Sequence, residues 1–286
     1  MANLDISRAQ RLDQRVVEQI PTLTRSYAAK LIDDGKVMVN GEVVTKAGYK
    51  MRDGDVVAVD HDEELFRRIP SIDLPVVYED EDCVVISKPV GLLAHSKGAF
   101  NPEPTVATWL RGRLRSMQGE RAGIVHRLDR ATSGVMICAR TPEALSWLQK
   151  QFSQRKVKKT YSAVVRGHLT EPEAVIDMPL ERNPKKPQTF RVGANGKVAV
   201  TKYVVTQTDD ARSLVELKPE TGRTHQLRVH MAHLGHPIVG DVLYGGEPAE
   251  RLYLHAHQLE ITLLSRERKV FTVAVPDAFK GLMHVD

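Results

Sequence analysis

Apolar positions in the first 60 residues follow a helical spacing and then a strand spacing. Leu12, Val16 and Ile20 recur at every fourth position, which predicts an amphipathic helix. The stretch TRSYAAKLIDDG predicts a second helix, and Asn40-Gly41 between β-branched runs predicts a hairpin. Two short helices followed by a small sheet form a unit of about 50 residues, a size typical of a module appended to a larger domain. We assign this unit to residues 8–60.

A charged segment separates this unit from the rest of the chain. Residues 61–74 contain one proline and no sustained periodicity, so they predict a linker. From residue 75 onward, strand patterns outnumber helix patterns and do not alternate with them regularly. This arrangement predicts an α+β domain over residues 75–286 with a mixed or mostly antiparallel sheet. Its expected helices cover residues 105–115 and 141–153, and its expected strands fall within 76–88, 159–169, 199–208, 213–219, 254–263 and 269–276.

Composition places the chain among ordinary globular proteins. Of its 286 residues, 42% are hydrophobic and 27% are charged, and the apolar runs are much shorter than the ~18 residues of a membrane span. The N-terminal stretch lacks the apolar core of a signal peptide. Cys83 and Cys138 lie far apart within apolar runs, which favours reduced core cysteines over a disulfide. We therefore expect a cytoplasmic protein.

Positive charge is concentrated in one part of the sequence. The net charge is +5, yet residues 111–160 carry twelve lysines and arginines against three acidic residues. Such a local excess is typical of a surface that binds a polyanion such as nucleic acid, although a solvated basic face would have the same composition. Charge alone leaves both interpretations open.

One carboxylate stands among arginines at the edge of an apolar run. In GIVHRLDRATSGVMICAR, Asp129 lies between Arg127 and Arg130, and the apolar residues 135–139 predict a buried strand. Asp129 therefore falls in the loop leading into that strand, with the Ser-Gly pair before the strand expected as the turn. The neighbouring guanidinium groups favour the ionised carboxylate, which can act as a nucleophile or a base. The alternative is a structural ion pair, which these residues alone leave open.

A second block, ETGRTHQLRVHMAHLGHPIVGDVLYGG, predicts a helix over residues 221–235 that ends at Gly235. Arg223 falls in the expected first turn, where the helix dipole disfavours a cation. Its presence there suggests a partner carboxylate, with Asp129 as the candidate; a solvent-exposed Arg223 is the alternative. The four histidines of the block lack a zinc-binding arrangement, so we expect no metal site.

Tyr161 follows a run of lysines on an expected strand. In KVKKTYSAVV, an aromatic ring next to Lys159 can stack on an unpaired base while the lysines hold phosphates. The alternative, a half-buried tyrosine without a functional role, is the more common fate of this residue type on a strand.

Taken together, these blocks resemble the pseudouridine synthase family, in its RluA branch. The resemblance covers most of residues 75–275. HRLDRATSG is similar to the family's His-Arg-Leu-Asp-x-x-Thr-Ser-Gly signature, and SKPVGLLAH, which contains Lys88, is similar to its Lys-Pro-x-Gly segment. KKTYSAVVRG, ETGRTHQLRVHMAHLGHPIVGDVLYG and RLYLHAHQLEI follow in the family's order. Residues 8–59 resemble the S-four-like RNA-binding module that many of these enzymes carry in front.

The resemblance implies an RNA isomerase. A uridine within an RNA chain would be converted to pseudouridine, its nitrogen–carbon glycosidic bond replaced by a carbon–carbon bond, with no metal or organic cofactor. Asp129 would be the essential catalytic group, and Tyr161 would stack on the target base and help remove the proton from the ring carbon. Arg223 would pair with Asp129. Arg127 would fill the space left by the extruded nucleotide, and Leu254 would pack behind the ring.

RNA is the partner that this resemblance implies. Family members with the front module mostly act on large-subunit ribosomal RNA, which makes ribosomal RNA the expected substrate and transfer RNA the alternative. A non-catalytic RNA-binding assembly factor and an aspartate-dependent glycosidase are further alternatives. We expect a monomer without an obligate protein partner. The expected RNA-binding residues are Arg127, Arg130, Leu254, Lys88 and Lys159 and, in the front module, Arg8, Arg11, Arg25 and Lys30.

Overall fold

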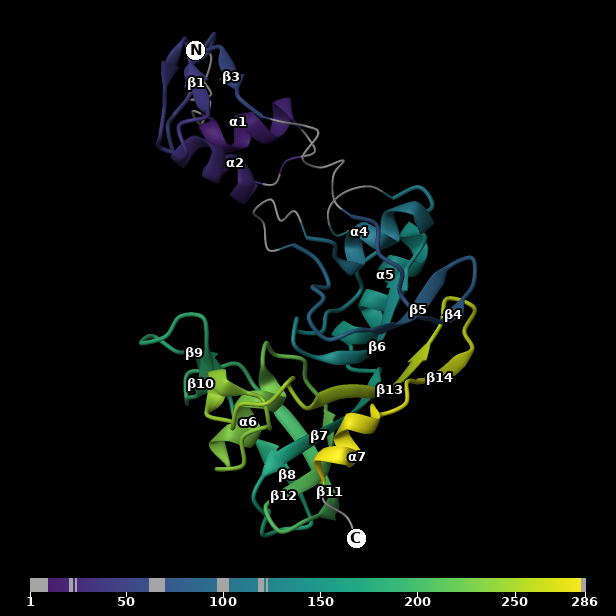
Figure 1. Cartoon of the computed structure of the whole chain (residues 1–286). Coiled ribbons are helices and arrows are strands. Elements are labelled where there is room, and N and C mark those ends of the chain that lie inside the picture. Colours follow the sequence, from purple (N-terminus) through teal and green to yellow (C-terminus); the bar gives the residue numbers. More distant parts are fainter. Residues whose placement is uncertain are drawn as a thin grey trace, which may run out of the picture. The chain divides into compact units, whose positions relative to one another are not determined.

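The computed structural model describes residues 10–20, 23, 25–61, 70–96, 103–117, 121 and 123–283 (Figure 1). Its contacts divide the chain into two compact units. One contains Met1–Ile72 and His95–Thr105, and the other contains Asp73–Ala94 and Val106–Asp286. Most of the expected linker, residues 62–69, lies outside the described residues. Each unit is therefore described by itself.

The front unit has the predicted helices and hairpin. Its sheet has the strand order β2-β1-β3, and both pairs are antiparallel. Asn40 and Gly41 both have positive φ, 52° and 85°, as a type I′ hairpin turn requires. Leu12, Val16 and Ile32 are fully buried in its core. The elements are α1 (Leu12–Gln19), α2 (Arg25–Asp33), β1 (Val37–Val39), β2 (Glu42–Val43) and β3 (Val57–Val59).

A large mixed sheet forms the second unit, and Figure 1 shows it extending from β4 to β8. The strand order is β4-β5-β6-β13-β7-β12-β11-β8, and β14 pairs with β13. All of these pairs are antiparallel except β6 with β13, so the predicted α+β class is confirmed. The strands are β4 (Val76–Glu79), β5 (Cys83–Lys88), β6 (Ser133–Ala139), β7 (Lys158–Arg166), β8 (Glu173–Asp177), β11 (Val200–Thr208), β12 (Arg212–Pro219), β13 (Leu254–Thr262) and β14 (Arg268–Thr272).

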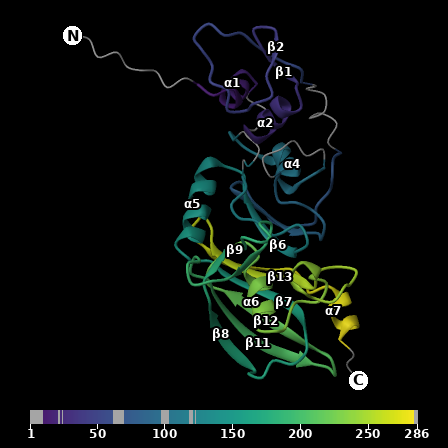
Figure 2. The same ribbon diagram turned by 90° about the vertical axis from the view of Figure 1, so that its left-hand side faces the viewer.

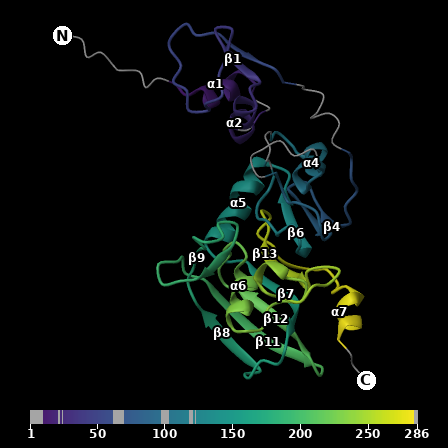
Figure 3. The same ribbon diagram turned by 60° about the vertical axis from the view of Figure 1, so that its left-hand side comes forward.

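Helices pack against this sheet at separate places. Figure 2 and Figure 3 show α6 beside β7 and β12, and Leu227 and Met231 of α6 share a buried cluster with residues of those strands. The hydroxyl of Thr141 accepts the backbone N–H of Ala144 and so caps α5. The remaining elements are α4 (Val106–Leu110) with the 3₁₀ turn η1 (Arg111–Arg113), α5 (Pro142–Ser153), β9 (Leu180–Arg182), β10 (Phe190–Val192), α6 (Gln226–His233), the 3₁₀ turn η2 (Val242–Tyr244) and α7 (Asp277–Leu282).

Two local predictions need correction. The helix expected over residues 221–235 begins only at Gln226, because His225 has φ 57° and ψ 17°, a left-handed conformation that a right-handed helix cannot contain. It still ends before Gly235, whose φ is 86°. Ser133 and Gly134, expected as a turn, are instead the first residues of β6.

β6 positions the loop that carries Asp129. All seven residues of the strand are buried, and the strand pairs with β5 along one edge and with β13 at Ser133 and Gly134 on the other. A Cβ at Gly134 would lie 2.2 Å from the carbonyl oxygen of Ala256, so only glycine permits this approach of the two backbones. The loop is thereby anchored in the middle of the core. Among the described residues, no helix has the length and apolar character needed to span a membrane.

Candidate active site

Hydrogen bonds to the core hold the segment that leads to Asp129. The backbone N–H of Ile137, on β6, donates to Nε2 of His126 at 3.1 Å. The His126 ring stacks on Phe152 of α5, with centroids 4.5 Å apart. Burial, with a smaller effect of Lys159, lowers the pKa of His126 to about 3, so the ring is neutral and can accept this hydrogen bond. The signature histidine is thus a fixed support for the loop.

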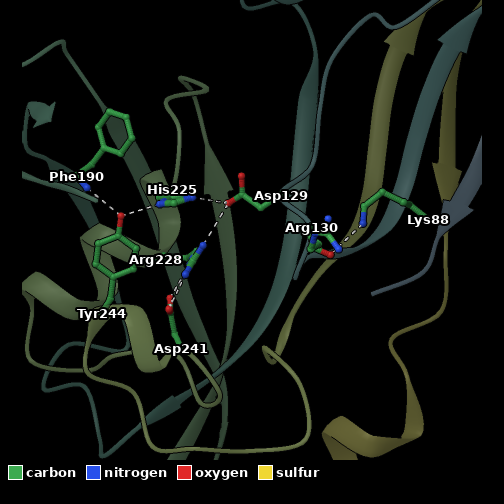
Figure 4. Close-up of polar contacts among 8 residues, drawn as sticks. All are labelled: Lys88, Asp129, Arg130, Phe190, His225, Arg228, Asp241 and Tyr244. Carbon is green, nitrogen blue, oxygen red and sulfur yellow. Dashed lines mark hydrogen bonds and ion pairs between the residues drawn. The ribbon is translucent and has the colours of Figure 1, made fainter. Parts of the chain in front are cut away.

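Lys88 supports the same loop from the other side. The side chain is fully buried, and its ammonium group donates to the carbonyl oxygens of Pro89 and Leu92 at 2.9 and 2.8 Å and to that of Arg130 at 3.4 Å. Figure 4 shows it beside Arg130, on the opposite side of that residue from Asp129. Burial lowers the pKa of Lys88 to about 8. The buried ammonium, bonded to backbone carbonyls and outside the pocket lining, disfavours the predicted RNA contact of Lys88 and favours a role in holding the loop.

A pocket of about 490 Å³ opens in front of Asp129. This volume lies within the ~300–1,000 Å³ range of small-ligand sites. The pocket brings together residues from four separate sequence blocks. Those that the sequence had singled out are Arg127, Asp129, Lys159, Tyr161, Arg223 and Leu254.

Tyr161 and Leu254 form the strand-borne wall of the pocket. Tyr161 lies on β7, where it pairs with Leu217 of β12 on one side and with Ala256 of β13 on the other. Leu254, also on β13, pairs with Ala163, which is two residues after Tyr161 on β7. Burial, and to a smaller extent the charge of Asp129, raises the pKa of Tyr161 well above its usual value. The phenol therefore keeps its proton at neutral pH and presents an aromatic face rather than a negative charge.

The cation beside Asp129 is Arg228, not Arg223. Nη1 of Arg228 lies 3.7 Å from Oδ2 of Asp129, while its Nε and Nη2 each donate to the carboxylate of Asp241 at 2.7 Å (Figure 4). Burial lowers the pKa of Arg228, but the bonds to Asp241 and the nearby carboxylates raise it more, so the guanidinium is firmly charged. Nε2 of His225 lies 3.8 Å from the same oxygen.

Arg223 lines the pocket but does not face the carboxylate. Its Nε donates to the carbonyl oxygen of Val198 at 3.0 Å, and its side chain is exposed. The predicted pairing with Asp129 is wrong because α6 starts at Gln226. Arg223 therefore belongs to the segment before the helix, while Arg228 lies on the helix itself.

The other predicted RNA-binding residues differ in their positions. Arg127 is exposed at the pocket, and Lys159 lies in its wall, where its ammonium group donates to the carbonyl oxygen of Thr221 at 3.3 Å. Burial lowers the pKa of Lys159 to about 8. Arg130 is exposed but does not line the pocket.

In the front unit, two of the predicted arginines share one buried carboxylate. Arg11 donates to both oxygens of Asp13 at 3.0 Å, and Nε of Arg25 donates to Oδ2 at 2.9 Å. Both side chains stay about half exposed, so a phosphate can still reach them. Lys30 is exposed on α2, and Arg8 lies outside the described residues.

Sequence analysis missed three members of the site, His225, Arg228 and Asp241. The available signal was the arginine of the HQLRVH stretch together with an aspartate thirteen positions later. That signal was hidden because the wrong helix start directed attention to Arg223. Among the described residues, no cluster of three or more histidine, cysteine or acidic side chains is arranged to hold a metal ion.

A fixed carboxylate beside a guanidinium, facing an aromatic ring in a basic pocket of this volume, defines an enzyme site for a unit of a polyanionic chain. Comparison with sequence families makes the class specific. The RNA pseudouridylate synthase family model matches residues 82–233, and the S4 domain model matches residues 10–57.

Comparison with individual proteins gives the same family. The chain is 42% identical to ribosomal large subunit pseudouridine synthase D of Escherichia coli strain K12, over 84% of this chain and 74% of the relative. It is 40% identical to an uncharacterized RNA pseudouridine synthase of Aquifex aeolicus, over 96% and 92% of the two chains. The solved structure of human RNA pseudouridylate synthase domain containing 1 is 33% identical, with a TM-score of 0.60 over 72% of this chain and 84% of that chain.

This chain belongs to the RNA pseudouridylate synthase family and carries an S4 domain in front of the synthase part.

Proposed function

We propose that this protein converts specific uridines of large-subunit ribosomal RNA into pseudouridine, with Asp129 as its catalytic carboxylate. The observation that carries the proposal is the single pocket in which Asp129, Tyr161 and Leu254 meet, in a chain of this family. The name of the Escherichia coli relative, ribosomal large subunit pseudouridine synthase D, supports ribosomal RNA as the substrate.

The reaction is an isomerisation without net loss of atoms. The bond between C1′ of the ribose and N1 of uracil breaks, the detached base turns, and C1′ bonds to C5. The proton that C5 carried is lost from the ring, and N1 gains one. The target must leave the helical stack before this chemistry, which costs a few kcal/mol. Arg127, exposed at the mouth of the pocket, is placed to occupy the vacated space.

Each pocket residue has a role that its surroundings support. Asp129 acts at the ribose or the base, aligned through Oδ2 by Arg228. The ring of Tyr161 offers the stacking surface for uracil. Its raised pKa makes the neutral phenol a poor base, which favours stacking over removal of the C5 proton. Leu254 packs behind the ring and helps exclude water, so the detached uracil stays in place.

The alternative functions are less well supported. A non-catalytic assembly factor has no need of a buried Arg228–Asp241 pair aimed at Asp129. Transfer RNA remains the second candidate substrate. A glycosidase would release free uracil, whereas the isomerase leaves the base attached to the ribose, so the product distinguishes the two functions. We further infer a cytoplasmic location, since ribosomal large subunit pseudouridine synthase D of Escherichia coli is named for ribosomal RNA. The domain limits 8–60, 61–74 and 75–286 and the monomeric state remain part of the proposal.

Replacing the carboxylate tests the proposal. Asp129→Asn keeps the shape of the side chain and removes its charge, so tritium release from C5-labelled uridine in a large-subunit ribosomal RNA transcript should fall by at least about 10⁴-fold. RNA affinity, measured by filter binding, should change by less than about threefold because the phosphate contacts are intact.

The matched control is Asp210→Asn, which removes an exposed carboxylate that does not line the pocket. This variant should keep wild-type turnover. Turnover by Asp129→Asn would contradict the role of Asp129. A wild-type protein that binds the transcript without any tritium release would support the assembly-factor alternative, and release of free uracil would support a glycosidase.

A further inference from the structure

A series of polar contacts runs from the backbone N–H of Phe190 through the Tyr244 hydroxyl and the His225 imidazole to the carboxylate of Asp129. The backbone N–H of Phe190, on β10, donates to the hydroxyl of Tyr244 at 3.0 Å. That hydroxyl lies 2.7 Å from Nδ1 of His225, and Nε2 of His225 lies 3.8 Å from Oδ2 of Asp129. Figure 4 shows the three side chains in line, with the imidazole between phenol and carboxylate.

Hydrogen-bond geometry selects one protonation pattern of the imidazole. The Tyr244 oxygen already accepts the N–H of Phe190, and burial raises the pKa of Tyr244, so the phenol keeps a proton that it can donate to Nδ1 of His225. A neutral ring that accepts at Nδ1 carries its proton on Nε2 and points that N–H at Asp129. The other tautomer would set a nitrogen lone pair against a carboxylate oxygen, which is repulsive.

The backbone and the neighbouring rings hold the imidazole in this orientation. His225 has φ 57°, a left-handed conformation that is uncommon for residues other than glycine, although asparagine, aspartate and histidine adopt it more often than the rest. Such strain is retained where the surrounding structure requires it, often at functional sites. The ring also packs edge-on against Tyr244 and Phe190, with centroids 5.6 and 5.9 Å away.

The two cationic or N–H-bearing side chains beside the carboxylate lie near the same oxygen of Asp129. His225 and Arg228 each approach Oδ2 of Asp129, and Figure 4 shows the other oxygen directed away from both. The separations of 3.8 and 3.7 Å are longer than hydrogen bonds, and such contacts tighten in substrate complexes. Two donors on one oxygen fix the rotation of the carboxylate and leave Oδ1 for the substrate.

We propose that His225 is a positioning residue for the isomerisation: its Nε2–H, set by the Tyr244 hydroxyl, holds Oδ2 of Asp129 so that Oδ1 faces the bound uridine. The inference rests on the proposed function, since it assigns the orientation of the same catalytic carboxylate. It adds a second donor, supported through Tyr244 by the backbone of β10, to the Arg228 guanidinium that Asp241 holds.

A matched pair of variants at His225 tests the donor. Glutamine can place an amide N–H where Nε2–H lies, whereas methionine has a similar length and no donor. Neither relieves the positive φ, so backbone strain is common to both. We expect kcat to fall roughly 100-fold in His225→Met with KM within about threefold of wild type, and His225→Gln to recover at least about tenfold of that loss. Equal activities of the two variants would overturn the proposal.

Tyr244→Phe tests the tautomer without touching the imidazole. Long-range ¹H–¹⁵N spectra of the wild-type protein should show His225 as the neutral ring protonated on Nε2, and Tyr244→Phe should shift it towards a mixture of tautomers. A wild-type ring protonated on Nδ1 alone would overturn the proposal. This readout needs no turnover. If the wild-type protein fails to isomerise ribosomal RNA, the proposed function fails, while the spectra still decide the state of His225.

Discussion

At the scale of single residues, the proposed catalytic carboxylate, Asp129, depends on partners that lie far from it in the sequence. Arg228 reaches Asp129 only because its own position is set by the two short bonds to Asp241. Both members of that pair are almost fully buried. Charge-assisted bidentate bonds fix a guanidinium more tightly than a single contact does. The remaining guanidinium nitrogen, Nη1, is thus presented to Asp129 in a fixed direction.

Removing this pair should impair catalysis more than removing Arg223. Arg228→Gln combined with Asp241→Asn deletes both charges, so no buried carboxylate is left unpaired. We expect kcat to fall roughly 100-fold, because Asp129 loses its aligned cation. Arg223→Gln removes an exposed arginine bonded to a backbone carbonyl, so it should alter KM by less than about tenfold and leave kcat nearly unchanged.

Steady-state kinetics on one ribosomal RNA transcript measure both effects, and urea unfolding shows whether the double variant is folded. The reverse order, with kcat sensitive to Arg223 and insensitive to the buried pair in folded protein, would contradict the structural assignment.

At the scale of elements, the parallel contact between β6 and β13 positions the whole site. β6 carries the Asp129 loop at its beginning, and β13 carries Leu254 at its beginning. The two strands meet at Ser133 with His255 and at Gly134 with Ala256. Gly134 has φ 120°, which side chains rarely tolerate. The contact between β6 and β13, which places Asp129 and Leu254 near each other, therefore requires a residue without a side chain at position 134.

Gly134→Ala should separate these strands. The new Cβ would lie 2.2 Å from the carbonyl oxygen of Ala256 and would also impose the strained φ, so the free energy of unfolding should fall by at least about 2 kcal/mol. Activity should fall with it, because Asp129 and Leu254 shift. Urea unfolding followed by circular dichroism measures the change.

Gly112→Ala is the control, since no heavy atom lies within 4 Å of a Cβ added there and its φ is not positive. It should change stability by less than about 1 kcal/mol. A Gly134→Ala protein as stable as this control would show that β6 and β13 can part without cost.

At the scale of the whole molecule, RNA affinity reflects the summed positive charge. Lys88 and Lys159 both have a pKa of about 8, and Lys159 is the one of these two that lines the pocket. The pKa of Lys159 is about 8 because its ammonium group is buried in the pocket wall. Its folded-state pKa is lowered, so the cation is present below pH 8 and is lost as the pH rises through that value. A bound phosphate favours the charged form, so binding at higher pH requires uptake of a proton.

The dissociation constant for the RNA transcript should therefore rise about three- to tenfold between pH 7 and pH 9 at fixed ionic strength. Lys159→Arg keeps its charge over this range and should lose most of that dependence. Lys159→Met should bind more weakly at pH 7 and also respond little to pH. Filter binding of the three proteins measures this, and an identical pH dependence in all three would exclude Lys159 as the titrating group.

Much of the architecture was predictable because it follows from local rules. The Asn40-Gly41 hairpin and the capped helix α5 depend on neighbouring residues, and strand patterns such as Val200–Thr208 depend on periodicity. The short strands β8 to β10 and helix α7 were not predicted. Three to six residues carry too little periodicity, and these elements exist because neighbouring structure covers them.

The sequence by itself determined the fold class, the family resemblance and the choice of Asp129 as the proposed catalytic carboxylate, because these depend on composition, periodicity and contiguous motifs. Only the tertiary structure decided which cation lies beside that carboxylate, that Lys88 is bonded to backbone carbonyls next to the loop, and that His225 lies at the site. Those facts depend on the left-handed backbone at residue 225 and on packing between strands distant in the chain. No spacing along the sequence encodes them.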